Sequence, residues 1–259
     1  MLTATQLYNA VTRSGSGYAS SVASEASVKQ QTNYFLANIG KVTTAQQLVN
    51  NSKLYNYVMN AFGLGSQINE KALITKALEG GPGSGSFAAS LNDPAITALV
   101  TAFNFKENGT TTTSSESVQQ QTVSSFYEQT LENNIGQQNQ GAQMALYFKR
   151  MAPQITSPYS ILGDKTLLKV VETAFNLPSS LSLENVDTQA SEIGQLLNVS
   201  QLQNPTFLQK FIGRFTASYD AQNPTGGNNA PPTVALLVSQ PSISQSLLLS
   251  IANLKMGGS

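Results

Sequence analysis

Two pairs of carboxylates are the residues of this chain best spaced for acid–base chemistry. Glu128 and Glu132 are four residues apart on an expected helix, and Glu184 and Asp187 are three residues apart. A general acid and a general base need pKa values that burial or a neighbouring charge has pushed apart. Both pairs have polar sequence neighbours, which favours solvated helix surface over a catalytic pair. We therefore expect no catalytic residue among these four.

Histidine and cysteine are both absent from the sequence. Their absence excludes a histidine general base, a thiolate nucleophile, disulfides and zinc sites built from Cys and His. We accordingly expect no cofactor, no metal and no enzymatic activity. An enzyme or small-ligand site between two lobes stays open as a less favoured alternative, because carboxylates, lysine, tyrosine and serine could still act.

A glycine-rich run, GGPGSGS over Gly80–Ser86, contains the type of residue that wraps phosphates. A phosphate-binding loop also needs a preceding buried strand and a Gly-Lys-Ser or Gly-Lys-Thr ending, and the run has neither. We interpret it as a flexible connection.

Lys149 and Arg150 follow Tyr147 and Phe148, which brings two cations next to two aromatic rings. Binding of nucleic acid through its phosphates requires several cations, whereas the whole chain has 14 basic and 14 acidic residues. We therefore predict no nucleic-acid partner and interpret the two cations as the C-terminal turn of a helix, where the helix dipole favours positive charge.

One segment of the chain occurs twice, with Tyr34–Leu64 aligning without a gap onto Tyr147–Leu177 at an offset of 113 residues. Eight of the 31 aligned positions are identical, and a run of identical and similar residues at one offset indicates an internal duplication. Six aromatic residues recur between the copies, and we expect them to anchor the core because large rings bury the most apolar area. They are Tyr34, Phe35, Phe62, Tyr147, Phe148 and Phe175.

Each copy contains an apolar stripe at helical spacing, which predicts an amphipathic helix with one buried face. The stripes are Leu54, Val58, Ala61 and Phe62 in the first copy, and Leu167, Val171, Ala174 and Phe175 in the second. Gly63 and Asn176 follow the stripes, and both residue types tolerate the left-handed conformation that ends a helix.

The same helix begins differently in the two copies. Thr43 and Thr44 precede Gln46 and Gln47 at capping-box spacing. In the second copy Ser157 precedes Pro158, which suits the first helical position because proline has no amide hydrogen to satisfy there.

Helical spacing recurs throughout, and no stretch sustains the alternation of a strand, so we predict an all-α fold. Further helices are expected over 70–78, 94–103, 123–134, 188–197 and 205–215. The expected organisation is two tandem, related helical bundles with a C-terminal helical tail. The five segments are an N-terminal helical or flexible segment over 1–33, a first helical repeat over 34–108, a polar linker over 109–122, a second helical repeat over 123–222, and a polar loop with a C-terminal helix over 223–259.

The C-terminal segment contains the most apolar run, Leu247–Leu254. This run is much shorter than the roughly 20 residues that cross a bilayer, so we expect no membrane insertion. Leu247, Leu248 and Ile251 share one helical face, and we interpret them either as packing within the chain or as a surface for a protein partner. We expect no Sec-type signal peptide, because the first residues do not have a charged leader followed by an apolar core and a small-residue cleavage site.

Three stretches of the sequence resemble the alphaproteobacterial domain-of-unknown-function family twelve-seventeen. They are YFLANIGKVTTAQQLVNNSKLYNYVMNAFGL, NQGAQMALYFKRMAPQITSPYSILGDKTLLKVVETAFNLP and QNPTFLQKFIGRFTASYD, and the resemblance covers about Tyr34–Asp220. The family is helical, and its members are often encoded among flagellar genes. This chain departs from it by its low content of charged residues, 11%.

The resemblance implies a non-enzymatic structural or assembly protein associated with the flagellum, with flagellar components as partners. The alternative is a cytoplasmic helical adaptor or regulator of flagellar assembly. In the first case residues 1–31 would carry an uncleaved export signal, and in the second they would form a docking helix. The sequence does not determine the oligomeric state.

Overall fold

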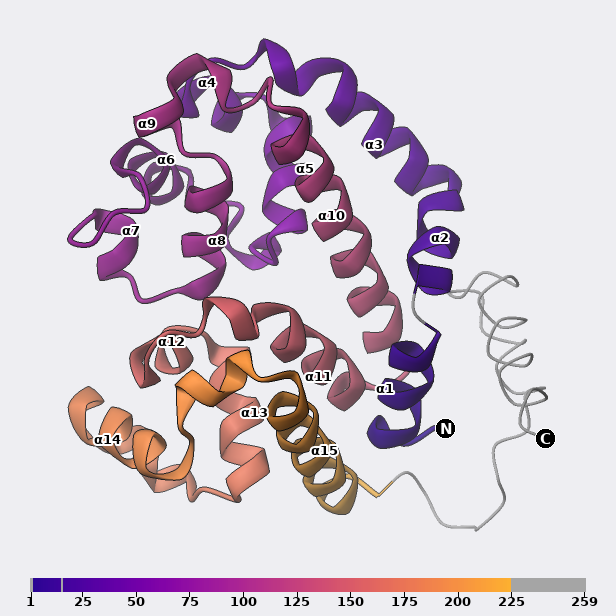
Figure 1. Ribbon diagram of the computed structural model, residues 1–259, viewed down its shortest axis with the longest axis vertical. Helices are drawn as coiled ribbons and strands as arrows, with labels where there is room; N and C mark the ends of the chain where they lie inside the picture. The colour runs from indigo at the N-terminus through magenta and orange to yellow at the C-terminus, as the bar shows by residue number, and fades with distance from the viewer. Residues whose placement is uncertain (1, 15, 225–259) are drawn as a thin grey trace. The chain divides into compact units, whose positions relative to one another are not determined.

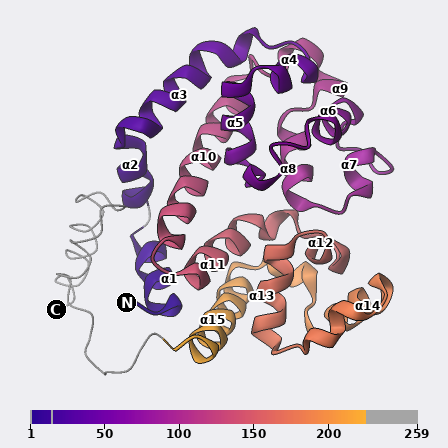
Figure 2. The same ribbon diagram turned by 180° about the vertical axis from the view of Figure 1, so that it is seen from behind.

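The computed structural model describes residues 2–14 and 16–224 (Figure 1, Figure 2). Every element in these ranges is an α-helix or a short 3-10 helix, and none of the described residues is in a strand. This confirms the all-α fold class. The chain forms two compact units, one from Ala26–Thr130 and the other from the described parts of Met1–Glu25 and Leu131–Ser259.

The unit Ala26–Thr130 is formed by one continuous part of the chain. Phe35, Tyr57 and Phe126 form a buried stack, with ring centroids 4.5 Å and 4.0 Å apart, and this stack joins α3, α5 and α10. The Thr32 and Tyr57 hydroxyls are hydrogen-bonded at 3.0 Å, which satisfies the buried phenol. Its elements are α3 (Ala26–Asn38), η1 (Ile39–Lys41), α4 (Ala45–Asn50), α5 (Ser52–Ala61), η2 (Gly65–Gln67), α6 (Lys71–Gly80), α7 (Phe87–Ser90), α8 (Pro94–Ala102), α9 (Phe105–Asn108), η3 (Gly109–Thr111) and the first part of α10 (Glu116–Gly136).

The other unit combines the first two helices of the chain with the second half. Its elements are α1 (Ala4–Arg13), α2 (Ser16–Ser24), the end of α10, α11 (Gln140–Met151), η4 (Ala152–Gln154), α12 (Pro158–Leu162), α13 (Lys165–Phe175), η5 (Ser179–Leu183), α14 (Val186–Leu196), η6 (Val199–Gln203) and α15 (Pro205–Gln222). The helices α11, α13 and α15 pack against one another, and α1 packs on α11 and α15. The predicted N-terminal segment 1–33 is thus divided, since α1 and α2 join this unit and α3 the other.

A buried cluster joins α1 and α2 to the later helices of their unit. It contains Leu7 and Val11 of α1, Tyr18 of α2, Ile135 of α10 and Ala142 of α11. The N-terminus of α1 is also fixed by α15, because the Asp220 carboxylate accepts the Ala4 and Thr5 amides at 2.7 Å and 3.1 Å. An acidic group at this position satisfies first-turn donors and complements the helix dipole.

Glycine is required where α11 meets α15. A Cβ atom added at Gly141 would lie 2.3 Å from Cδ1 of Tyr219, far inside contact distance. Gly213 of α15 is the opposite case, because a Cβ added there would meet nothing within 4 Å.

The structure differs from the predicted polar linker over 109–122. Residues 109–111 form η3, and residues 116–122 are the first turns of α10, so the helix expected over 123–134 is much longer. Thr113 is fully buried, and its hydroxyl donates to the carbonyl of Val42 at 2.5 Å. The run is therefore not a simple linker. Most of it is exposed, but Thr113 can be buried because its hydroxyl is hydrogen-bonded inside the unit.

The two copies of the repeated segment have the same order of elements. The order α3, η1, α4, α5 in the first copy is matched by α11, η4, α12, α13 in the second, and η1 and η4 begin and end at the predicted offset. The apolar stripes are largely buried in both copies; Phe175 is half-buried. A common origin of the two segments stays a prediction from the sequence.

The predicted helix ends are confirmed. Gly63 and Asn176 have φ angles of 80° and 52°, in the left-handed region. The next amides, of Leu64 and Leu177, each donate to the carbonyl five residues earlier, at 2.8 Å and 2.9 Å. This is the Schellman arrangement, which satisfies carbonyls that the helix leaves open.

The predicted helix starts are confirmed in position. Thr44 caps α4 by accepting the Gln47 amide at 3.2 Å, and the Gln47 side chain accepts from the Thr43 amide at 2.8 Å. Ser157 and Pro158 start α12, although the Ser157 side chain makes no capping hydrogen bond there.

Candidate functional site

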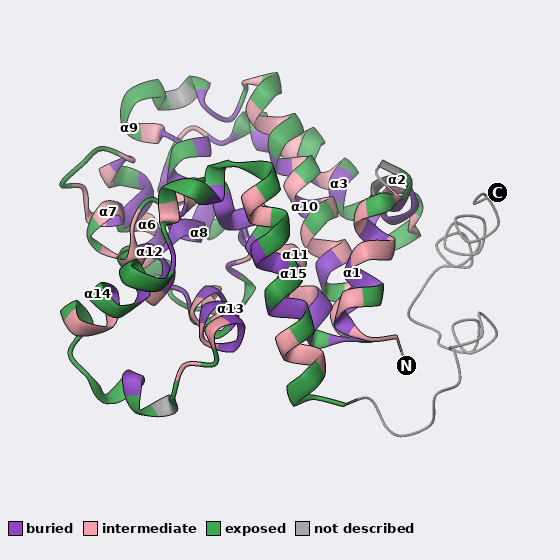
Figure 3. Ribbon diagram, turned by 60° about the horizontal axis from the view of Figure 1, so that its bottom comes forward, coloured by how far each residue is buried: buried purple, intermediate pink, exposed green. Residues whose placement is uncertain are grey.

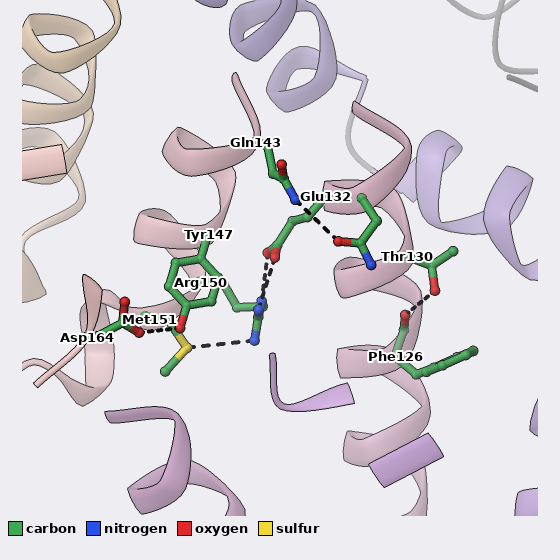
Figure 4. Close-up of polar contacts among 9 residues, drawn as sticks. Phe126, Thr130, Glu132, Gln143, Tyr147, Arg150, Met151 and Asp164 are labelled. Atoms are coloured by element: carbon green, nitrogen blue, oxygen red, sulfur yellow. Dashed lines mark hydrogen bonds and ion pairs between the residues drawn. The ribbon is translucent and has the colours of Figure 1, made fainter. Parts of the chain in front are cut away.

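The most distinctive polar feature of the described residues is a buried ion pair between α10 and α11. Arg150 donates from Nε to Oε1 of Glu132 at 2.7 Å, and from Nη2 to Oε2 at 3.0 Å (Figure 4). The Glu132 side chain is 4% exposed and that of Arg150 13%. Two parallel bonds between a guanidinium and a carboxylate fix both groups in one geometry.

The burial of Glu132 corrects the interpretation of this residue as solvated surface. The short turn between α10 and α11 brings Arg150 opposite the last turns of α10, where Glu132 lies. Glu128 is one turn earlier on α10 and is exposed, as predicted. Glu184 and Asp187 are also exposed, so neither carboxylate pair forms a buried dyad.

Arg150 is linked through Tyr147 to the start of α13. The Arg150 guanidinium lies 5.2 Å from the centroid of the Tyr147 ring, within the range of a cation–π contact. The Tyr147 hydroxyl donates a short hydrogen bond to Oδ2 of Asp164. Oδ1 of Asp164 accepts the Thr166 and Leu167 amides at 2.7 Å and 3.0 Å, which caps α13.

This chain of contacts, which we call the Glu132–Asp164 network, has a structural effect. It ties the end of α10, the last turns of α11 and the first turn of α13 through side chains whose oxygens already accept hydrogen bonds. A buried polar network of this kind gives unique positions to the helices that it joins. A substrate that bound Glu132 or Asp164 would have to displace one of these contacts.

Tyrosines with raised pKa values occur in the cores of both units. Burial raises the pKa of Tyr8 and of Tyr18 to about 12, and raises that of Tyr57 as well. A phenol shifted in this direction stays protonated at neutral pH, so these residues serve as core side chains. The exposed Tyr159 differs, because its hydrogen bond to Asp187 is the main cause that raises its pKa.

The other sequence-predicted candidates are distributed as follows. Lys149 and Arg150 lie in the last turn of α11, as predicted. The glycine-rich run joins α6 to α7, where Gly81 and Gly85 have positive φ angles and Ser86 caps α7. Of the six repeated aromatic residues, Phe35, Phe62 and Phe148 are buried, while Tyr34, Tyr147 and Phe175 are half-buried.

Leu247, Leu248 and Ile251, the predicted partner surface, lie outside the described residues. Within residues 2–14 and 16–224, no three acidic side chains are grouped so that they could hold a metal ion. None of the helices described is both long and apolar enough to span a bilayer.

Sequence reasoning missed a group of exposed apolar residues on α12, η5 and α14. They are Tyr159, Leu183, Val186 and Leu196, and we call them the α14 surface. Apolar spacing alone does not indicate which of these residues stay exposed, so they were identified only from the structure.

The fold and the Glu132–Asp164 network define a helical protein whose buried polar groups hold helices together. A family model described as a protein of unknown function (DUF1217) matches residues 61–208, more than half of the chain. The chain is also similar to a crystal structure, that of protein AGR_C_984 from Agrobacterium tumefaciens, a structural genomics target. The TM-score is 0.77 at 32% identity, covering 84% of this chain and 93% of that one. The chain therefore belongs to the DUF1217 family, as the resemblance indicated. No curated protein matches it.

Proposed function

We propose that this protein is a non-enzymatic structural or assembly component associated with the flagellum. The observation that carries the proposal is the buried ion pair of Glu132. Of the four carboxylates best spaced for acid–base chemistry, Glu132 is the one that is buried. Both of its oxygens accept from Arg150. A general acid or base has to reach a substrate proton within hydrogen-bond distance, whereas this carboxylate is used to hold α10 against α11.

The assembly role is supported by the α14 surface, since a group of exposed apolar residues on neighbouring elements can mark a contact with another protein. The flagellar association follows from the family resemblance described above. The alternative is a cytoplasmic adaptor or regulator of flagellar assembly, which would use the same helical surfaces but remain in the cell.

The location of the protein in motile cells distinguishes these alternatives. We expect it in sheared flagellar fractions, and we expect it to be absent from them in a strain that lacks the flagellar exporter. Recovery from the cytoplasm alone in both strains would support the adaptor instead. Recovery from neither a flagellar fraction nor a complex with flagellar proteins would contradict both.

A paired variant tests the non-enzymatic part of the proposal. Glu132→Leu with Arg150→Met removes the carboxylate and its partner together and keeps the site filled with apolar atoms. We expect the folded double variant to support motility as the wild type does. Loss of function in a double variant with wild-type stability would show that the carboxylate acts chemically.

A further inference from the structure

The exposed large apolar side chains of the described residues are concentrated at one place. Tyr159, Leu183, Val186 and Leu196 are 38%, 86%, 57% and 45% exposed, and all lie on α12, η5 or α14. The other one in the described ranges is Leu36 of α3, at 43%. Scattered exposed apolar residues need no explanation, but a group on neighbouring elements does.

The helix α14 is only partly covered by the rest of its unit. Ala190 and Ile193 are buried, and Val186 precedes Ala190 by one turn on the same side of the helix, yet it is exposed. The helix that packs on α14 is α12, which is only five residues long. Its Tyr159 hydroxyl donates to Oδ1 of Asp187 at 2.8 Å, which places that ring at the first turn of α14.

The exposed apolar residues lie at the two ends of α14. Val186 and Leu196 are ten positions apart, which at about 100° per residue puts them roughly 80° apart around the helix, on either side of Ile193. Leu183 precedes the N-cap, Asn185, by two residues, so it lies near Val186 at the N-terminal end of α14. Figure 3 shows residues of η5 and most of α14 as exposed.

The charged residues of α14 and of the segments beside it in sequence are acidic. Glu184, Asp187 and Glu192 are all exposed on or beside α14. The sequence between Lys169 and Lys210 contains no basic residue at all. A partner with positive charge is therefore attracted to this surface, and one with negative charge is repelled.

We propose that the α14 surface binds an amphipathic, basic segment of a protein partner. The apolar residues of such a segment, spaced three and four apart, would contact Leu183, Val186 and Leu196, and its flanking Lys or Arg side chains would meet Glu184 and Glu192. This inference names the kind of partner for the proposed assembly function. It rests on that function in one respect, which is that an assembly protein acts by binding other proteins.

Two other occupants fit less well. A two-fold contact between copies of this chain would bring the same acidic residues face to face, because each copy presents the same patch. The C-terminal residues 225–259 include apolar positions but only one basic residue, Lys255, so they match the apolar part of the surface and not its charge.

The test measures the binding of two labelled helical peptides to the purified full-length protein by fluorescence anisotropy. Both peptides have leucine at helical spacing; one has lysine at its polar positions and the other glutamate. We expect the lysine peptide to bind at least about tenfold more tightly than the glutamate peptide. Because truncating central apolar contacts typically costs a factor of ten or more, Leu183→Ser with Val186→Ser should weaken binding of the lysine peptide about tenfold.

Leu36→Ser is the matched control, since Leu36 is about as exposed as Leu196 but lies in the other unit. It should leave binding unchanged. A second variant, Glu184→Gln with Glu192→Gln, changes only exposed charges and should weaken binding while reducing its dependence on salt.

Three results would overturn the inference: equal affinity for both peptides, unchanged affinity in both double variants, or a loss of affinity in Leu36→Ser equal to that in the apolar double variant. A wild-type dimer that the double variants dissociate would assign the surface to a second copy and also overturn it. These outcomes concern the purified chain, so they are distinguishable from the localisation result that tests the proposed function.

Discussion

Replacing Glu132 by glutamine is the substitution that best tests the structural role of the buried ion pair. The change keeps the shape of the side chain but removes its charge, so Arg150 loses the negative charge of its partner in a site where its side chain is 13% exposed. Breaking a buried pair from one side costs about 3–5 kcal/mol. Because Arg150 keeps its contact with the Tyr147 ring, we expect the lower value, about 3 kcal/mol.

This loss is large compared with the stability of a folded unit. Single domains are stable by about 5–15 kcal/mol, and 3 kcal/mol lowers the ratio of folded to unfolded protein roughly a hundredfold. Urea unfolding followed by far-ultraviolet circular dichroism measures it. With a slope of about 1–3 kcal/mol per M, the transition of the unit that contains α10 and α11 should move to lower urea by about 1–3 M.

Two matched variants make the test specific. Glu128→Gln alters an exposed carboxylate one turn earlier on α10 and should change the free energy of unfolding by less than about 0.5 kcal/mol. Glu132→Leu with Arg150→Met should recover most of the loss, since apolar replacements of a buried pair are often neutral. A Glu132→Gln protein as stable as Glu128→Gln, or a double variant no better than the single one, would refute the reasoning.

The remaining predictions concern packing, pH and the helix terminus. Gly141→Ala should destabilise the protein by about 1–3 kcal/mol because its Cβ would meet the α15 tyrosine ring. Gly213→Ala should stabilise the protein by about 0.5–1 kcal/mol. Thermal unfolding of both variants measures these opposite effects. Tyr8 and Tyr18 have pKa values raised by burial from 10.0 to about 12. Their contribution to stability is therefore complete below pH 10 and is lost as the pH rises through 12. A free energy of unfolding that does not change with pH over this range would contradict the raised pKa values. Asp220→Ala should cost about 1 kcal/mol and speed hydrogen exchange of the first amides of α1, and unchanged exchange would show that the carboxylate does not cap the helix.

The sequence was sufficient for the helices that depend on local signals. The stripe from Leu54 to Phe62 and its counterpart in the second copy fix a buried face, and Gly63 and Asn176 end both helices by backbone conformation alone. Such signals act within a few residues, so they can be identified without knowing the partners of a helix.

The features that the sequence did not predict depend on residues distant along the chain. Glu132 is buried because Arg150, 18 residues later, neutralises it, and Thr113 is buried because the carbonyl of Val42 accepts its hydroxyl. Polar neighbours in sequence indicate exposure only when no distant group satisfies them. The exposure of Val186, one turn before the buried Ala190, is likewise not indicated by the apolar spacing of α14.

The division of one folded unit between the two ends of the chain has a consequence for synthesis. The apolar residues Leu7 and Val11 leave the ribosome early, but they are covered by α10 and α11, and α1 is secured by Asp220 close to the end of α15. At about 5–20 residues per second, translation takes on the order of ten seconds or more to supply that cover. Throughout this interval the apolar face of α1 lacks the helices that cover it in the folded unit, so a chaperone can bind it before it folds.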